Sequence, residues 1–265
     1  MMDLHTHSEF SLDCKTPTEE NIKRAIELGI KYISITEHLD ITRPEEDYRK
    51  SLDIDGYLKK VSELRDKYKD DIDVLYGVEL SIQSNTGKAY EKIVKDRGYD
   101  FIIGSAHGAE GKYFVGNEVY SKYSIEDFYK YYYEQIQKSV ENTDCFNVLG
   151  HIDYMDRYFP NKEEIPPIED YFEYIKPTLK SLIERGKGIE INTASFRKGL
   201  DYYHPKRQVL QLYKSLGGEI VTLGSDAHLV EEIGFNILNA IKMLKQEGFN
   251  KAHIFKEGKP VAINL

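Results

Sequence analysis

Two of the chain's eight histidines lie within its first seven residues. His5 and His7 flank Thr6 in the segment MMDLHTHSEF, and Asp13 follows them. Alternate residues of a strand point to opposite faces, but at the end of a strand both side chains can turn toward one site. Imidazole nitrogens and carboxylate oxygens are common ligands of zinc and related divalent metals. His5 and His7 are therefore a candidate pair of metal ligands. The alternative, if nothing else in the chain supports a metal site, is that they are exposed histidines near a terminus.

Further polar residues of the same kinds recur along the chain, each in or just after a short run of β-branched residues. They are His38, Glu79, His107, His151, Asn192, Asp226 and His228, in the segments ISITEHLD, YGVELS, GSAHG, VLGHIDY, EINTAS and LGSDAH. Together with the first segment these make seven strand-end windows, which are the catalytic positions of parallel barrels. If the eight histidines were scattered evenly, roughly one would fall in the seven windows, whereas six do. The pattern favours one shared site. His204, which opens a predicted helix, and His253 lack this context.

The segments that must position these residues alternate between strand and helix patterns. Strands are predicted over residues 1–5, 31–36, 73–80, 99–105, 145–150, 187–193 and 219–225. Helices are predicted over residues 16–29, 53–68, 86–98, 124–142, 168–186, 204–218 and 231–248. In the first helix we expect Thr16 to be the cap, Glu19 to complete a capping box and Gly29 to end the helix. Pro177 predicts a kink or break in the helix over 168–186.

Seven strand–helix units without linkers predict a single α/β domain over residues 1–265, a distorted (β/α)7 barrel. An open doubly wound sheet is the alternative, but no G-x-G-x-x-G motif follows the first strand. Because the carboxyl ends of barrel strands converge on one face, the strand-end residues should meet in space. Eight or nine nitrogen and oxygen ligands are too many for one ion, so we expect two to three divalent ions of zinc, manganese or iron.

The composition excludes several classes of function. A net charge of −9 and a pI near 5.5 argue against tight binding of nucleic acid, which depends on lysines and arginines that neutralise phosphates. Cys14 and Cys145 are far apart and form no thiolate metal motif. The N-terminus is too polar for a signal peptide, and no apolar run approaches the roughly 18 residues of a membrane helix. These features predict a cytoplasmic protein that binds no membrane; its oligomeric state stays open.

The segments DLHTHSEFSLD, ITEHLD, GVEL, GSAH, GHIDY and GSDAH, in this order, resemble the polymerase and histidinol phosphatase (PHP) superfamily. Within it, HIDYMDRYF and EINTASFRKG are most similar to the histidinol-phosphate phosphatases. The resemblance implies a distorted seven-stranded barrel with three metals. It assigns their ligands as three sets: His5, His7, Glu79 and Asp226; Glu79, His107 and His151; and His38, His228 and Asp13.

The chemistry implied is hydrolysis of a small phosphomonoester. Bridging metals lower the pKa of a shared water, so that hydroxide can attack the phosphorus in line. We expect the substrate to be L-histidinol phosphate, as in histidine biosynthesis, with Glu79, Asp226 and His228 as catalytic residues. Arg157 and Arg197, on loops after the fifth and sixth strands, are expected to clamp the phosphate.

Other functions remain as alternatives. A relative of the same superfamily could act on another phosphomonoester or on a nucleotide. A metal-dependent amidohydrolase would need a metal-binding lysine at a strand end, which the sequence lacks, and a polymerase-associated nuclease would need a basic groove. A non-catalytic binding protein would be expected to have lost some ligands. Glu37 and Asp40 flank His38 and could orient a histidine, although we interpret Asp40 as a polar loop residue.

Overall fold

The computed structural model describes residues 1–115, 122–159 and 161–265. Seven parallel strands form one sheet in the order β1-β2-β3-β4-β7-β8-β9. Their bounds are β1 (Met2–Thr6), β2 (Tyr32–Leu39), β3 (Asp73–Ser81), β4 (Phe101–Ser105), β7 (Val148–Leu149), β8 (Gly188–Asn192) and β9 (Val221–Gly224). The first and last strands meet through a parallel bridge between Thr6 and Ala227, and the His7 amide donates to the Ala227 carbonyl at 2.9 Å. The predicted distorted (β/α)7 barrel is therefore confirmed.

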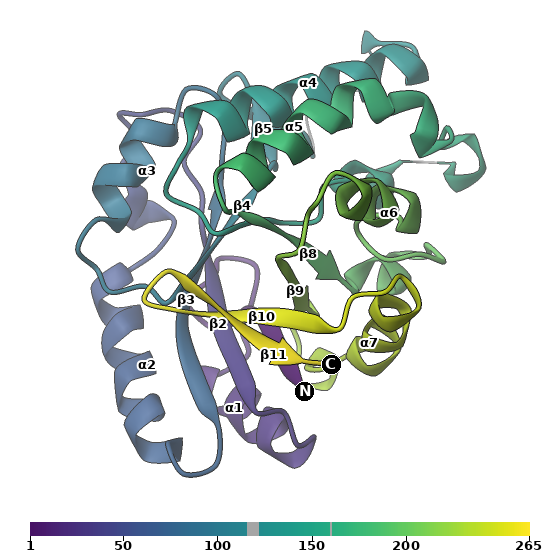
Figure 1. Cartoon of the computed structure of the whole chain (residues 1–265). Coiled ribbons are helices and arrows are strands. Elements are labelled where there is room, and N and C mark those ends of the chain that lie inside the picture. The colour runs from purple at the N-terminus through teal and green to yellow at the C-terminus, as the bar shows by residue number, and fades with distance from the viewer. Residues whose placement is uncertain (116–121, 160) are drawn as a thin grey trace.

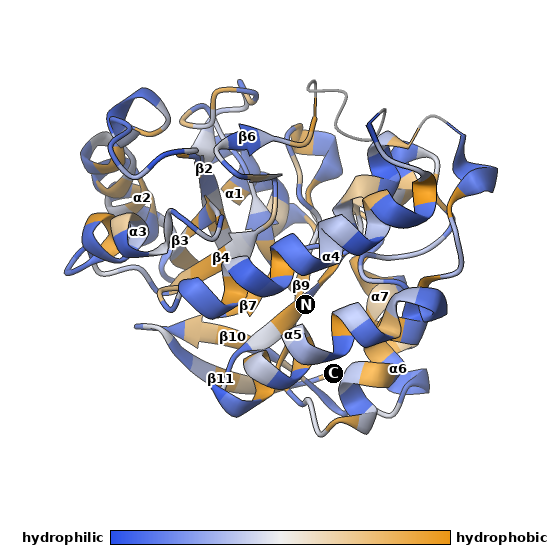
Figure 2. Cartoon of the chain, turned by 90° about the horizontal axis from the view of Figure 1, so that it is seen from above, coloured by the Kyte–Doolittle hydropathy of each residue, from blue (hydrophilic) through white to orange (hydrophobic). Residues whose placement is uncertain are grey.

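Helices surround this sheet (Figure 1). They are α1 (Thr18–Glu27), α2 (Ile54–Tyr68), α3 (Gly87–Val94), α4 (Ile125–Asn142), α5 (Phe172–Glu184), α6 (Arg207–Ser215) and α7 (Ile237–Gln246). Short 3₁₀ helices interrupt the loops: η1 (Tyr48–Lys50), η3 (Tyr154–Tyr158), η4 (Lys162–Glu164), η5 (Ile168–Tyr171), η6 (Ala194–Lys198) and η7 (Val230–Glu232). In Figure 2 the outer helices carry both hydrophilic and hydrophobic residues, as helices with one buried face do.

The strands are covered on both sides, which explains their continuous apolar runs. Every residue of β1, β8 and β9 is buried. The Tyr57 hydroxyl is hydrogen-bonded within this core, at 2.8 Å from the Ile35 carbonyl and 2.7 Å from the Gly77 carbonyl. Gly77 makes room for this packing, because a Cβ there would lie 2.3 Å from the Ser34 hydroxyl. The barrel wall is thus a rigid base for the residues at its upper rim.

The start of α1 differs from the prediction. The residue preceding the helix is Pro17, and the capping box expected from Thr16 and Glu19 is wrong. The Glu9 carboxylate, from the loop before the helix, accepts from the Thr18 amide instead. The Thr16 hydroxyl donates to the His228 carbonyl at 2.9 Å, so this residue ties the loop to the end of the barrel rather than capping the helix.

Of the other predicted element boundaries, one agrees with the structure and two differ from it. Gly29 ends α1 as predicted, with a φ of +68°. Of the kink or break expected at Pro177, the break is wrong, because α5 continues on both sides of this residue. The fifth strand is shorter than predicted, since β7 comprises only Val148 and Leu149.

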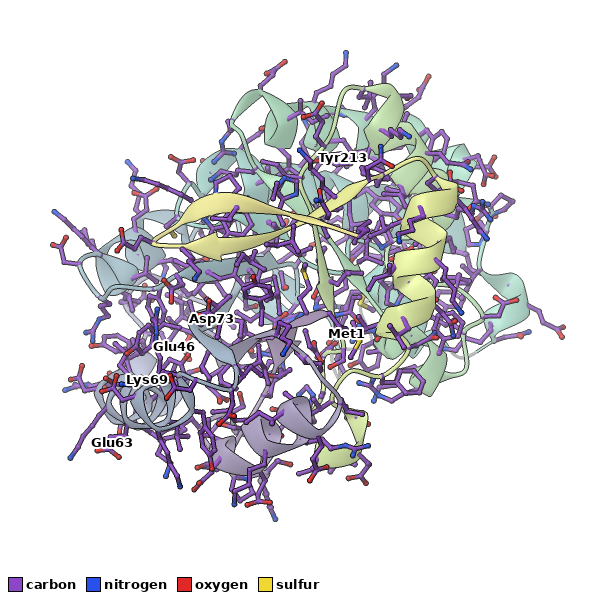
Figure 3. The ribbon with its side chains drawn as sticks, turned by 60° about the horizontal axis from the view of Figure 1, so that its bottom comes forward. Met1, Glu46, Glu63, Lys69, Asp73 and Tyr213 are labelled. Atoms are coloured by element: carbon purple, nitrogen blue, oxygen red, sulfur yellow. The ribbon has the colours of Figure 1, made fainter. Side chains whose placement is uncertain are left out.

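A hairpin that was not predicted follows the last helix. It consists of β10 (Lys251–Lys256) and β11 (Lys259–Asn264), and a second two-stranded ribbon pairs β5 (Gly108–Ala109) with β6 (Lys112–Tyr113). Figure 3, with the bottom of the molecule forward, shows the yellow hairpin crossing it. β10 contacts β4 and β9, and the Glu257 amide donates to Asp100 Oδ1 at 3.0 Å. The hairpin therefore covers the end of the barrel opposite to the catalytic strand ends.

Among the described helices, none combines the length and the apolar character needed to cross a membrane.

Candidate active site

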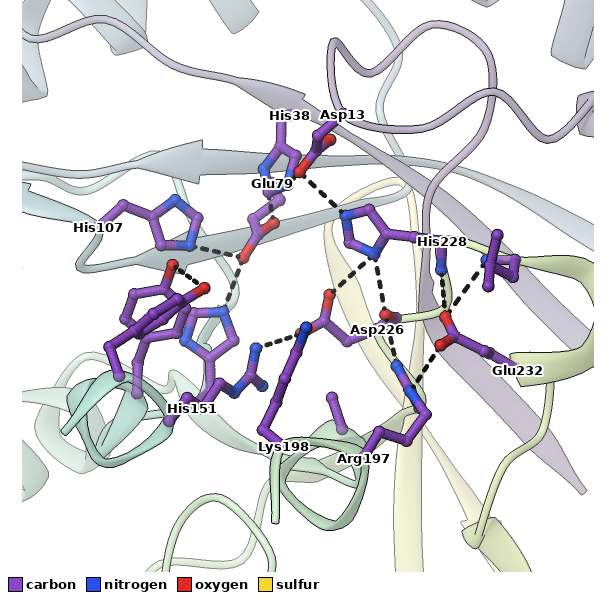
Figure 4. Close-up of a pocket in the computed structure, with 15 residues that line it drawn as sticks. Asp13, His38, Glu79, His107, His151, Arg197, Lys198, Asp226, His228 and Glu232 are labelled. Carbon is purple, nitrogen blue, oxygen red and sulfur yellow. Dashed lines mark hydrogen bonds and ion pairs between the residues drawn. The ribbon is translucent and has the colours of Figure 1, made fainter. Parts of the chain in front are cut away.

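A cavity of about 370 Å³ opens at the carboxyl ends of the barrel strands, and Figure 4 shows its lining. Most of the predicted metal ligands line it: Asp13, His38, Glu79, His107, His151, Asp226 and His228. The other two, His5 and His7, are fully buried and contact the cluster from the end of β1. All nine predicted ligands therefore lie at one site, although they are spread over most of the chain.

Glu79 lies at the centre of this cluster and is fully buried. One oxygen, Oε1, lies 3.0 Å from His151 Nε2 and 3.4 Å from His107 Nε2. The other, Oε2, lies 3.2 Å from His5 Nε2, 3.0 Å from His38 Nδ1 and 3.6 Å from His7 Nε2. Burial opposes the charge, but the neighbouring imidazoles outweigh it and hold the pKa of Glu79 well below its usual value. A single carboxylate is thus shared by five histidines.

The spacing of these atoms fits ligands that share a cation. Glu79 Oε2 makes no hydrogen bond despite its close imidazole neighbours, and the Nε2 atoms of His5 and His7 are 3.1 Å apart. Metal–ligand bonds of about 2.0–2.1 Å place the corners of a tetrahedron roughly 3.3 Å apart, which matches these separations. Three sets of ligand atoms lie within 4.8 Å of one another: His7, His38 and His228; His5, His7 and Glu79; and His38, Glu79 and His107.

These sets overlap more than the three ligand sets inferred from the family resemblance. His7 groups with His38 and His228 as well as with His5, and His38 also groups with Glu79 and His107. Burial, followed by the nearby His38 and His228, lowers the pKa of His7 well below its usual value. The neutral imidazole favoured in this way is the form that ligates metals. Nitrogen and oxygen donors without thiolates suit zinc, manganese or iron.

Asp226 joins the cluster from the loop after β9. Its Oδ1 lies 3.5 Å from His7 Nε2 and 3.8 Å from His5 Nε2, and its amide donates to the His5 carbonyl at 2.7 Å. The backbone of Asp226 is left-handed, with a φ of 56°, which is rare for a residue with a side chain. A strained backbone of this kind persists only where neighbouring contacts stabilise it. In Asp226 this conformation places the carboxylate beside His5 and His7, at the end of β1.

Glu190 supports the cluster from behind and was missed by the sequence analysis. It is buried in β8, with Oε1 2.6 Å from His5 Nδ1, while Oε2 accepts from the His151 amide at 3.1 Å and from Asn192 Nδ2 at 3.2 Å. This contact directs His5 Nε2 toward Glu79. The sequence feature that could have identified Glu190 is a carboxylate inside the otherwise apolar strand KGIEINT.

Glu37 and Asp40 also contact the cluster through its histidines. The fully buried Glu37 accepts from the hydroxyl of Ser11 at 2.5 Å, and that hydroxyl lies 3.2 Å from His7 Nδ1. Asp40 lies in the loop after β2, as expected, but its Oδ1 is 3.9 Å from His107 Nδ1. Glu37 can therefore fix the orientation of His7 through Ser11, whereas 3.9 Å is too long for a hydrogen bond from Asp40 to His107.

Both predicted phosphate-binding arginines line the cavity. Arg157, on η3, donates to Asp226 Oδ2 and to Asn192 Oδ1, each at 2.8 Å. Arg197, on η6, donates to the Asp226 carbonyl at 2.9 Å, and its Nε lies 3.0 Å from Glu232. Each guanidinium keeps one buried nitrogen without a hydrogen-bond partner, Nε of Arg157 and Nη1 of Arg197. Oriented, unpaired donors of this kind suit the oxygens of an anion.

The rim of the cavity is formed by Asp13 and His228. Asp13 is exposed, and its Oδ2 lies 3.3 Å from His228 Nε2 and 3.6 Å from His38 Nε2. Cys14 is a packed thiol, as expected, and its Sγ donates to the His228 carbonyl at 3.0 Å. The two loops are thereby held together at the place where substrate would enter.

The remaining two histidines lie outside the cluster. His204 is buried and its Nδ1 is 2.5 Å from Asp153 Oδ1, while His253 lies in the hairpin on the opposite end of the barrel.

Comparison with known proteins agrees with this geometry. The family model described as PHP domain matches residues 3–194. A histidinol-phosphatase of Lactococcus lactis subsp. lactis is 29% identical over 96% of this chain and 94% of the relative. A probable histidinol-phosphatase of Clostridium acetobutylicum is 30% identical over 97% of both. The crystal structure of the Lactococcus lactis histidinol phosphate phosphatase, complexed with zinc, L-histidinol and phosphate, has a TM-score of 0.88 at 28% identity and covers 98% of both chains. With its barrel, its strand-end ligands and these similarities, the chain belongs to the PHP domain family.

Proposed function

We propose that this protein is a metal-dependent phosphomonoesterase that hydrolyses L-histidinol phosphate to L-histidinol and phosphate. The observation that carries the proposal is the set of nine imidazole and carboxylate side chains with Glu79 at its centre, in a cavity that two arginines border. Full-length similarity to histidinol-phosphatases, one of them with zinc, L-histidinol and phosphate bound, supports the substrate.

We propose that two to three divalent ions of zinc, manganese or iron bind to His5, His7, Asp13, His38, Glu79, His107, His151, Asp226 and His228. Glu79 is the residue best placed to bridge, because its two oxygens face different histidines. Divalent ions held by such ligands lower the pKa of a coordinated water toward neutrality and offset the charge of a phosphate.

The side chains of the protein then bind and orient the substrate. Arg157 and Arg197 approach the cavity from η3 and η6, and their guanidinium groups would hold phosphate oxygens. Donors on both groups are occupied by Asp226, Asn192 and backbone carbonyls, so each guanidinium is fixed before substrate arrives. Fixed donors of this kind stabilise the charge that develops on a phosphate without reorganising.

The leaving alkoxide needs a proton, and we propose that His228 donates it when its imidazole is not coordinated to a metal, since a ligating imidazole is neutral. Asp226 is deeply buried and paired with Arg157, whereas the side chain of His228 is 28% exposed at the cavity rim. Asp13, 3.3 Å from His228 Nε2, favours the protonated imidazole there.

The test is a panel of phosphomonoesters with purified protein of measured metal content. The expected result is the highest kcat/KM on L-histidinol phosphate and loss of activity after chelation. Faster hydrolysis of nucleotide monophosphates would reject the substrate and leave a phosphomonoesterase of another kind. Hydrolysis of amides but of no phosphate ester would reject the reaction class.

A further inference from the structure

A second cavity, of about 430 Å³, adjoins the candidate active site. Asp13, His38, His107 and Tyr154 line both cavities, so these residues form the boundary between the two. The phosphate of a substrate belongs beside the metal ligands and arginines of the first cavity. The alcohol portion of a phosphomonoester bound there must therefore extend past the boundary residues or along the opposite wall.

The charges on these two walls differ in sign. The opposite wall carries Arg197 and Lys198, and its acid Glu232 is already paired with Arg197 Nε at 3.0 Å. Figure 4 shows Lys198 and Arg197 on the side of the cavity away from His38 and Asp13. A substrate whose alcohol portion is a cation would be repelled from that wall.

The second cavity is lined by Asp40, Glu46 and Asp47, and Lys50 is the basic residue among its lining. We call it the acidic cavity. Asp47 is neutralised by Arg49, whose Nε and Nη2 donate to it at 2.8 and 2.9 Å. Asp40 and Glu46 are the other two carboxylates of this group.

The carboxylate of Glu46 remains available, whereas Asp40 turns its Oδ1 toward His107 Nδ1, at 3.9 Å. Asp40 Oδ1 is shielded from solvent and makes no hydrogen bond. Glu46 uses one oxygen, Oε2, to accept from the amide and hydroxyl of Thr42 at 2.8 and 3.1 Å. Within the described part of the chain, no basic side chain pairs with Glu46.

We propose that the acidic cavity binds the cationic organic portion of the substrate, with Glu46 as a residue that determines specificity. This inference rests on the proposed function, because that function places the phosphate in the first cavity. An alcohol portion with an ammonium group and an imidazole fits this site. Neutral or anionic alcohol portions lose the attraction and are selected against.

The test compares Glu46→Lys with Glu45→Lys, a matched control whose exposed side chain is adjacent in sequence but does not line either cavity. The first readout is the ratio of kcat/KM for L-histidinol phosphate to that for glycerol phosphate, whose alcohol portion is uncharged. We expect Glu46→Lys to lower this ratio at least tenfold, Glu46→Gln to lower it about threefold to fivefold, and Glu45→Lys to leave it unchanged. The differences should shrink as salt is added.

The second readout is calorimetric binding of L-histidinol to the metal-loaded protein, which does not depend on turnover. Glu46→Lys should weaken it at least tenfold relative to Glu45→Lys. If Glu46→Lys and Glu45→Lys have the same affinity for L-histidinol and the same ratio of kcat/KM values, the role of the acidic cavity is overturned. The proposed function still stands in that case, provided that the unaltered protein hydrolyses L-histidinol phosphate. If L-histidinol binding depends on Glu46 but L-histidinol phosphate is not hydrolysed, the proposed function is rejected and the role of the acidic cavity stands.

Discussion

Replacing Glu190 by glutamine should reduce the metal affinity of the site without disturbing the fold. Three donors converge on the two oxygens of Glu190: His5 Nδ1 at 2.6 Å, the His151 amide at 3.1 Å and Asn192 Nδ2 at 3.2 Å. Glutamine has the same shape but only one acceptor oxygen. If that oxygen faces His151 and Asn192, the amide group faces His5 and favours the tautomer with the proton on Nε2, the atom that should bind metal.

The size of the effect follows from the buried contact. Loss of a carboxylate partner from a ligating histidine typically costs 10- to 100-fold in metal affinity, which corresponds to about 1.4–2.7 kcal/mol. Because Glu190 is 1% exposed, water cannot replace the lost interaction, and we expect the upper end of this range.

The assay is zinc affinity by competition with a chelator, together with metal content and kcat/KM. Glu184→Gln, at the exposed end of α5, is the matched control and should retain wild-type values. If Glu190→Gln binds zinc as tightly as Glu184→Gln, the orientation of His5 by Glu190 is not needed and the reasoning is refuted.

Four other changes have defined outcomes. Glu79→Ala should lose more metal than His228→Ala, because the Glu79 oxygens face two different groups of histidines, and elemental analysis that finds full occupancy would remove the bridge. Arg197→Ala should lower kcat/KM about 10- to 100-fold with unchanged metal content, and Arg197→Lys should restore only part of it because the planar fork is lost. Arg157→Ala should cost at least as much activity, because it also leaves Asp226 without its cation, and wild-type kinetics for both alanine variants would assign phosphate binding to other groups. Tyr90→Phe should lower the free energy of unfolding by about 1–3 kcal/mol, measured by urea denaturation, since its hydroxyl accepts from a buried backbone amide at 2.9 Å.

Much of the fold could be predicted because the barrel strands are buried on both faces. That burial requires the β-branched runs that mark the strands, and Gly29 marks the end of a helix because its backbone is left-handed. The hairpin over β10 and β11 left a weaker signal, since β11 is largely exposed and its residues are not constrained by packing. Its turn residues Glu257 and Gly258 both have positive φ, as is typical of a two-residue hairpin turn. In the sequence, Gly258 was the residue that could have indicated this turn.

The sequence predicted that the site residues lie close together, but it did not predict their contacts with one another. The nine predicted ligands lie together, since the ends of parallel strands must converge in a barrel. Glu190 gave a weaker signal, because a carboxylate in a strand is informative only when its partner is known, and that partner, His5, is 185 residues away. The pairing of Arg157 with Asp226 and the closeness of His7 to His228 depend in the same way on how β9 meets β1.

The sequence by itself determined the order of strands and helices, the residue types at the strand ends and hence the class of chemistry, because these are local properties of the chain. Only the tertiary structure decided which imidazoles share Glu79, which acids orient them and how the active site joins the acidic cavity. Those contacts arise when the barrel closes between Thr6 and Ala227, which sets ångström-scale distances between residues far apart in the sequence.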